Sequence, residues 1–255
     1  MREIPSPAIT ETVAKLCEQA NLKLPCGMRE CISGSIQREE SELCRSVLGD
    51  IVSNIDCAAE LGVPICQDTG MACVFIELGQ DAHIDGDLTD AVNEGVRRGY
   101  EKAFLRKSIT ADPLQRVNTG DNTPAFLTVH LVPGSACKIT VAPKGAGSEN
   151  MSRLAMLKPA DGVEGVKKFV LHTVEQAGAN PCPPIVLGIG IGGSFDHCAA
   201  LAKKALLRPL DEPNADPYYA ALEKELLDAI NATGFGPQGF GGATTCLGVA
   251  IEQKP

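Results

Sequence analysis

A thiol, an amide, a carboxylate and a hydroxyl stand next to one another in the segment Cys66-Gln67-Asp68-Thr69-Gly70. A thiolate can bind a metal, and a carboxylate beside it can accept a proton. The segment lies between Pro64, which ends a long helical pattern, and an apolar run over residues 71–78. The sequence therefore predicts a polar turn from helix to strand, a place that positions reactive groups well. Taken alone, the pattern also fits a polar loop with a buried thiol.

A second thiol is held between prolines in Asn180-Pro181-Cys182-Pro183-Pro184. Proline fixes its own φ and forces the preceding residue to be extended, so the main chain on both sides of Cys182 is rigid. A reactive thiolate needs such support. The alternative is a stiff loop whose thiol has no role.

Two further segments suit an anionic ligand. Small residues in Lys144–Asn150 follow a predicted strand and would let backbone N–H groups approach an anion, although a flexible loop has the same composition. Arg106 and Lys107 end a helical pattern over residues 87–105, where positive charge also complements the helix dipole.

The glycines of Gly188–Gly193 match G-x-G-x-x-G, a pattern of dinucleotide-binding folds. Here Ile189 and Ile191 alternate with them, so the strand continues through the motif rather than ending before it. We expect these glycines to let another element pack closely on the strand. Titration with a nicotinamide cofactor would test the dinucleotide alternative.

Composition narrows the class of protein. The 255 residues carry a net charge of −9 and no basic run longer than a pair, which disfavours nucleic acid and anionic membranes as partners. No apolar stretch could span a bilayer and the N-terminus resembles no signal peptide, so we expect a cytoplasmic protein. The 11 cysteines include no Cys-x-x-Cys pair, which predicts reduced and mostly buried thiols.

Hydrophobic periodicity predicts an α/β fold, with a helical N-terminal section followed by a mixed sheet with flanking helices. We expect a single domain over 1–255, in which a helical section 1–62 packs on an α/β section 63–255. The predicted helices cover 7–21, 27–38, 41–61, 87–105, 161–177, 196–207 and 218–232. The predicted strands cover 72–78, 125–132, 136–142, 185–191 and 245–251, and the turn at 133–135 predicts that the second and third form a hairpin.

Six motifs occur in the same order as in one known family, and together they span nearly the whole chain. The chain resembles the alpha subunit, or N-terminal domain, of class I fumarate hydratases and L(+)-tartrate dehydratases. The motifs are Cys66-Gln-Asp-Thr-Gly70, Asn118-Thr-Gly-Asp-Asn-Thr-Pro124, Lys144-Gly-Ala-Gly-Ser-Glu-Asn-Met-Ser152, Asn180-Pro-Cys-Pro-Pro184, Gly190-Ile-Gly-Gly-Ser194 and Gly239-Phe-Gly-Gly-Ala-Thr-Thr245.

The resemblance implies a hydro-lyase with a [4Fe-4S] cluster held by three cysteines, whose fourth iron acts as a Lewis acid. By position, Cys66 and Cys182 resemble two of the cluster ligands. Gln67 and Asp68 resemble the polar pair at the reacting substrate, and Arg106 resembles the arginine that binds a substrate carboxylate. The backbone of Gly145, Ala146 and Gly147 resembles the loop that binds substrate; the family usually has a third glycine at the position of Ala146.

The chain departs from the family pattern at its C-terminal end. In the family the third ligand and a nearby histidine follow the strand that matches residues 245–251, whereas this sequence stops at Pro255, so we expect the C-terminal tail to be missing. Cys246 is the candidate substitute; otherwise the third ligand is absent. None of the four histidines matches the family histidine, and we expect structural roles for all four.

The resemblance also implies a partner, because the two-subunit enzymes carry further substrate residues on a beta subunit. We expect this chain to act only with a beta subunit, in an oligomer such as a heterotetramer, on a small 2-hydroxydicarboxylic acid. Malate-to-fumarate dehydration is the first reading, and L(+)-tartrate dehydration is the alternative. A reading of another class is a non-catalytic assembly or regulatory chain without a cluster.

Overall fold

The computed structural model describes residues 1–255, and its contacts divide the chain into two compact units. The first unit contains Met1–Leu24 and Ile55–Ala146, and the second contains Pro25–Asn54 and Gly147–Pro255. Each unit is thus built from two separate segments of the chain. The single-domain organisation expected from the sequence stays a prediction.

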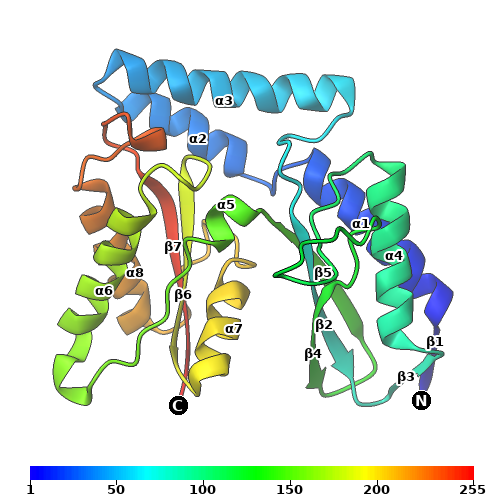
Figure 1. Ribbon diagram of the computed structural model, residues 1–255. Helices are drawn as coiled ribbons and strands as arrows, with labels where there is room; N and C mark the ends of the chain where they lie inside the picture. The colour runs from blue at the N-terminus through cyan, green and yellow to red at the C-terminus, as the bar shows by residue number, and fades with distance from the viewer. The chain divides into compact units, whose positions relative to one another are not determined.

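The first unit combines a three-stranded sheet with two long helices (Figure 1). Its helices are α1 (Ser6–Leu22), α4 (Leu88–Lys102) and the end of α3 (Glu42–Leu61), which begins in the second unit. Its strands are β1 (Arg2–Pro5), β2 (Met71–Gly79), β3 (Ala82–Asp85), β4 (Phe126–Val132) and β5 (Cys137–Lys144). The short parallel pair of β1 and β3 was not predicted from the sequence.

Strand β2 lies in the middle of the sheet, in the order β4-β2-β5. It pairs in parallel with β4, where Ile76 lies opposite Val129, and antiparallel with β5, where Ile76 lies opposite Ile139. The predicted hairpin between residues 125–132 and 136–142 is therefore wrong. The connection between these two strands instead passes the end of β2, where the Gly79 N–H donates to the Ala136 carbonyl at 2.7 Å. Because β2 is the most buried strand of this sheet, pairing both of its edges overrides the local hairpin signal.

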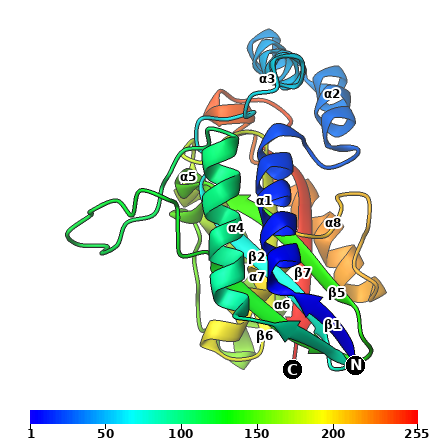
Figure 2. The ribbon, with the colours of Figure 1, turned by 90° about the vertical axis from the view of Figure 1, so that its right-hand side faces the viewer.

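Helices α1 and α4 lie side by side and cover one face of this sheet (Figure 2). Their contact is close because α4 carries glycine where it meets α1: a Cβ on Gly95 would lie 2.7 Å from the Cβ of Val13. The core that results buries Val13, Val74 and Val96 completely. This packing gives β2 a fixed base, and the Cys66–Gly70 segment leads directly into β2.

Helix α4 ends three residues earlier than the periodicity predicts, at Lys102. Phe104, which falls inside the predicted helix, has a φ of 54° and is 92% exposed. The chain leaves the helix at Ala103, and the segment up to β4 extends away from α4 (Figure 2). Part of this segment is an ordered turn closed by the Thr119 N–H, which donates to the Ile109 carbonyl at 3.0 Å.

The second unit packs helices on both faces of a two-stranded parallel sheet (Figure 1). Its strands are β6 (Ile185–Gly192) and β7 (Cys246–Lys254). Its helices are α2 (Met28–Arg38), the first part of α3, the short α5 (Ala146–Glu149), α6 (Gly162–Ala177), α7 (Phe195–Ala205) and α8 (Pro217–Asn231), with 3-10 turns η1 (Pro159–Asp161) and η2 (Pro237–Gly239). The core on one face joins α6 and α8 to β7 through Val174, Leu226, Ile230 and Ile251.

The G-x-G-x-x-G match is explained by packing. Helix α7 lies against β6 so closely that a Cβ on Gly190 would collide with the Cys198 carbonyl, and one on Gly188 with the Ala202 carbonyl. Both glycines lie inside β6 rather than after its end. The prediction that another element packs closely on this strand is confirmed.

The predicted fold class is confirmed, since the β4-β2-β5 and β6-β7 sheets are flanked by helices and the strand directions are mixed. Six of the seven predicted helices begin and end within about two residues of their expected bounds, an error typical of helix ends, and the seventh is α4. None of the helices combines the length and apolar character that crossing a membrane requires.

Candidate functional site

The Cys66–Gly70 segment is the turn between α3 and β2, as predicted. Gly70 adopts a φ of 63°, and a Cβ there would overlap the main chain of Lys144. Only glycine can therefore make this turn beside β5. The side chains alternate in exposure: Gln67 is exposed, Cys66 and Asp68 are half-buried, and Thr69 is buried. The thiol, amide and carboxylate of the turn are thus accessible, whereas the Thr69 side chain packs into the interior.

The sulfur of Cys66 lies in a polar setting. The Asp68 backbone N–H donates to the Cys66 Sγ at 3.4 Å, and the Cys66 thiol lies 3.4 Å from the Gln67 Oε1. Hydrogen bonds to the ligand sulfurs are a usual feature of iron–sulfur sites. This environment fits a metal-binding thiolate at Cys66.

Asp68 makes a contact that the sequence did not suggest. Its Oδ2 accepts a hydrogen bond from the Ala146 N–H at 3.0 Å, so two predicted substrate contacts bind each other in the structure. The approach is close enough that a Cβ on Gly145 would lie 2.9 Å from the same oxygen. Glycine at 145 is therefore needed to bring the loop to the carboxylate.

Arg106 is tied to the same turn through its backbone. The Thr69 Oγ1 accepts from the Arg106 N–H at 2.9 Å and donates to the Arg106 carbonyl at 3.2 Å. The Arg106 side chain is exposed and forms no ion pair. The structure thus brings together four of the predicted site residues in the first unit, Cys66, Gln67, Asp68 and Arg106, with Ala146 beside them.

Two buried side chains, Tyr100 and Asn122, support the turn and were missed by the sequence interpretation. The Tyr100 hydroxyl donates to the Thr69 carbonyl at 3.0 Å and lies 3.3 Å from the Gly70 carbonyl. Burial raises the pKa of Tyr100 above its usual range, which keeps this hydroxyl a donor. Asn122 donates to the Gly70 carbonyl at 3.2 Å. The dense turn signal around Asn118–Pro124 marked the position of Asn122, but not its contacts.

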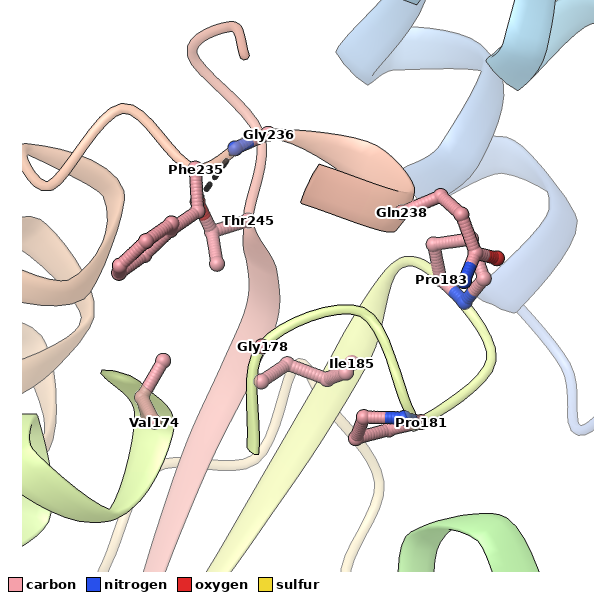
Figure 3. Close-up of a pocket in the computed structure, with 9 residues that line it drawn as sticks. All are labelled: Val174, Gly178, Pro181, Pro183, Ile185, Phe235, Gly236, Gln238 and Thr245. Atoms are coloured by element: carbon pink, nitrogen blue, oxygen red, sulfur yellow. Dashed lines mark hydrogen bonds between the residues drawn. The ribbon is translucent and has the colours of Figure 1, made fainter. Parts of the chain in front are cut away.

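Cys182 lies in the second unit, on the loop that enters β6. Its thiol side chain is exposed, whereas its neighbour Pro181 is buried. A small cavity behind the loop is lined by Pro181, Pro183 and Thr245 among others, and the Gly236 N–H donates to the Thr245 Oγ1 beside it (Figure 3). The segment 234–242 is a glycine-rich loop, and its Gln238 side chain donates to the Ala179 carbonyl. The segment that precedes β7 thus supports the Cys182 loop through the hydrogen bond from Gln238.

The same glycine-rich loop is fixed by Glu39, a third residue that sequence reasoning missed. Glu39 is 3% exposed, and its carboxylate accepts from the Ala243 N–H at 2.9 Å and the Thr244 N–H at 2.6 Å. The sulfur of Cys44 donates to the Gly241 carbonyl next to them. No sequence pattern around Glu39 distinguishes it from the exposed Glu40 beside it.

The chemistry of these donors can be compared with that of an iron–sulfur cluster. Cys66 and Cys182 fit, because both are reachable thiols on supported loops and the first has an N–H directed at its sulfur. Cys246 does not fit. It is 2% exposed, donates to the Gly248 carbonyl at 3.1 Å, and has a pKa that burial raises to about 12. A thiol in that setting stays protonated, and no three metal-ligating side chains gather within either unit.

Comparison with known proteins places the chain in a family of hydro-lyases. The sequence matches the family described as "Fumarate hydratase (Fumerase)" over residues 10–255. It is 42% identical over 252 residues to a putative L(+)-tartrate dehydratase subunit alpha of Methanocaldococcus jannaschii, covering 96% of this chain and 88% of that relative. It is 32% identical over 248 residues to the L(+)-tartrate dehydratase subunit alpha of Escherichia coli K12, covering 96% of this chain and 82% of that relative.

The chain is therefore an enzyme of the lyase class, and specifically one that adds or removes water. It belongs to the fumarate hydratase (Fumerase) family. The resemblance inferred from the six motifs is confirmed.

Proposed function

We propose that the chain is the alpha subunit of an iron–sulfur hydro-lyase that reversibly dehydrates a small 2-hydroxydicarboxylic acid in the cytoplasm. The observation that carries the proposal is the double hydrogen bond between Thr69 and Arg106, which joins the turn of Cys66 to a free guanidinium in one folded unit. An arginine whose main chain is tied to a proposed metal-binding turn suits an anionic substrate that would also meet the metal.

The chain's own residues would divide the work. Cys66 and Cys182 would hold a [4Fe-4S] cluster, which supplies a Lewis acid for the departing hydroxyl. Arg106 would bind a substrate carboxylate through its guanidinium. Gln67 would orient the substrate with its exposed amide, and the half-buried Asp68 would hold or move a proton. The backbone of Gly145–Gly147 would add N–H donors, of which that of Ala146 is presented by Asp68.

A beta subunit would supply the remaining substrate contacts. Because the buried Cys246 does not fit, the third cluster ligand would be another residue. The relatives are both named as alpha subunits, which supports a two-chain enzyme. We propose that the two chains form an oligomer such as a heterotetramer. We propose that this chain alone is inactive. Full dehydratase activity of the isolated chain would contradict this.

Anaerobic reconstitution with iron and sulfide tests the cofactor, read by absorbance near ~400 nm, the charge-transfer region of thiolate-bound iron. Absorbance that is lost in both Cys66→Ser and Cys182→Ser, and kept in a control at the exposed Cys57, would support the cluster site. Absence of a cluster in wild type together with the beta subunit would favour a non-catalytic assembly chain instead.

The substrate is decided by assay of the two-subunit enzyme on malate, fumarate and L(+)-tartrate. Malate-to-fumarate dehydration is the first proposal, and the names of both relatives favour L(+)-tartrate as the second candidate. The substrate with the larger kcat/KM identifies the activity.

A further inference from the structure

Asn122 is completely buried and lies between the two segments that carry the proposed substrate site. Its main chain adopts a φ of 62°, a left-handed conformation that asparagine tolerates better than most residues. Its neighbours Asp121 and Thr123 are half-buried and bind each other, the Thr123 Oγ1 lying 2.7 Å from the Asp121 Oδ1. Asn122 alone of the three points its side chain fully into the interior.

The amide of Asn122 makes three hydrogen bonds, all to main-chain partners. Its Nδ2 donates to the Gly70 carbonyl at 3.2 Å, and its Oδ1 accepts from the Ser108 N–H at 2.6 Å and the Ile109 N–H at 3.2 Å. One side chain therefore links the end of the Cys66–Gly70 turn to the chain two residues after Arg106. A buried amide with three partners is costly to replace, because any partner left alone loses its hydrogen bond.

The segment that carries Arg106 is thus linked to the Cys66–Gly70 turn at two points. Thr69 binds the main chain of Arg106 itself, and Asn122 binds Ser108 and Ile109 just beyond it. Both anchors lead back to consecutive residues of the turn, Thr69 and Gly70. A long arginine side chain reaches a substrate reproducibly only if its main chain is held in place.

We infer that Asn122 is a positioning residue for the dehydratase: it sets the place of the Arg106 guanidinium relative to Gln67 and Asp68, and so determines how tightly the substrate carboxylate is held. This inference rests on the proposed function. Asn122 touches no substrate; its effect passes through Arg106.

A double-mutant cycle on the complex of this chain with its beta subunit tests the inference. Asn122→Gly deletes the amide and keeps the left-handed backbone accessible, and Arg106→Ala deletes the guanidinium. Each single change is expected to raise KM for the dicarboxylate by about tenfold or more, with a smaller effect on kcat, as expected for the loss of a charge-assisted contact. Because the two residues act as one unit, Arg106→Ala in the Asn122→Gly background should raise KM much less than it does in wild type.

Two further variants separate positioning from folding. Gln115→Ala is the matched control, since Gln115 is an exposed amide side chain on the same loop between α4 and β4. It should leave KM within about twofold of wild type, as expected for a surface site away from the chemistry. If Asn122→Gly fails to fold, Asn122→Asp keeps the acceptor and the shape while removing the donor to Gly70, and enters the same cycle.

Hydrogen exchange of the isolated chain adds a readout that needs no activity. Loss of protection at the Ser108 and Ile109 amides in the Asn122 variants, with unchanged protection in the core strand β2, would support the inference. Additive effects of Asn122 and Arg106, or an unchanged KM in Asn122→Gly, would overturn it and leave the proposed function intact. An unchanged KM in Arg106→Ala would instead overturn both the proposed role of Arg106 and the inference.

Discussion

The Asp68 carboxylate and the Ala146 backbone N–H are joined by a hydrogen bond of 3.0 Å, although the two residues lie 78 positions apart. The bond connects the turn before β2 with the loop after β5, and the antiparallel pairing of these strands, in which Met71 lies opposite Lys144, makes it possible. Asp68 thus has two roles that a substitution can separate. It accepts the Ala146 N–H, which needs only an oxygen at that position, and we propose that it holds or moves a proton, which needs the carboxylate.

Replacing Asp68 by asparagine should therefore separate the two roles. The amide oxygen can still accept from Ala146, but it cannot take a proton as a carboxylate does, so kcat of the two-subunit enzyme should fall by about 10²-fold or more. Protection of the Ala146 amide from hydrogen exchange should stay as in wild type. Asp68→Ala should lower kcat and also lose the protection of the Ala146 amide. A kcat of Asp68→Asn close to that of wild type would exclude the proposed role in proton transfer.

The thiols should divide by reactivity in the native chain. Cys182 is exposed and Cys66 half-buried, whereas Cys17 and Cys246 are buried with a pKa raised to about 12. Because the thiolate is the reactive form, iodoacetamide at neutral pH should modify the first two and spare the last two. Peptide mass mapping after short exposure measures this. Modification of Cys246 as fast as Cys182 would contradict the packing described for β7.

Stability should decline in alkaline solution for the same reason. The folded pKa of Cys17 is raised from 9.0 to about 12, mainly by desolvation, so the folded state keeps a proton that the unfolded chain releases. This contribution is constant below about pH 9 and is lost as the pH rises from about 9 to 12, at no more than ~1.4 kcal/mol per pH unit.

Urea denaturation at several pH values measures the decline. Cys17→Ala removes the titrating group, so its dependence on pH above 9 should be shallower than that of wild type. The exposed Cys26 provides the control, because Cys26→Ala should leave the pH dependence unchanged. Equal slopes for all three proteins would show that the Cys17 thiol is not desolvated as described.

Glu39 should matter far more than its neighbour. Glu39→Ala leaves the part-buried Ala243 N–H and the buried Thr244 N–H without their acceptor, which should lower the free energy of unfolding by about 2–4 kcal/mol. Glu40→Ala, at an exposed position, should change it by less than about 0.5 kcal/mol. Denaturant titration of both variants compares them directly, and equal losses would contradict the proposed support of the glycine-rich loop.

Sequence reasoning located the helices and the turn of Cys66 because those features are local. Periodicity marks a helix such as α1, and proline and glycine mark its ends. Sequence reasoning failed where residues far away in the sequence determine how the strands pair. The signal at 133–135 predicted a hairpin, but β2, which lies earlier in the chain, separates the two strands. A short parallel pair such as β1 and β3 leaves no pattern in either segment alone.

The candidate site shows the same division. Cys66, Asp68 and Arg106 were found through motifs, yet nothing in the motifs indicates that Asp68 binds the Ala146 N–H. Asn122 was interpreted only as part of a turn, because the sequence does not show whether an asparagine is buried or exposed. Its importance follows from burial and from partners 13, 14 and 52 positions away, which only the folded chain reveals.

The interleaving of the two units constrains how the chain can be made and cut. Residues 25–54, which belong to the second unit, are synthesised between the two halves of the first. On the ribosome the first unit therefore cannot close before residue 146 has emerged, and helix α2 must wait still longer for residues 147–255, the rest of the second unit. No single proteolytic cut or stop codon releases either unit whole. To obtain one alone, the segments of a unit would have to be rejoined in a new order by a designed linker.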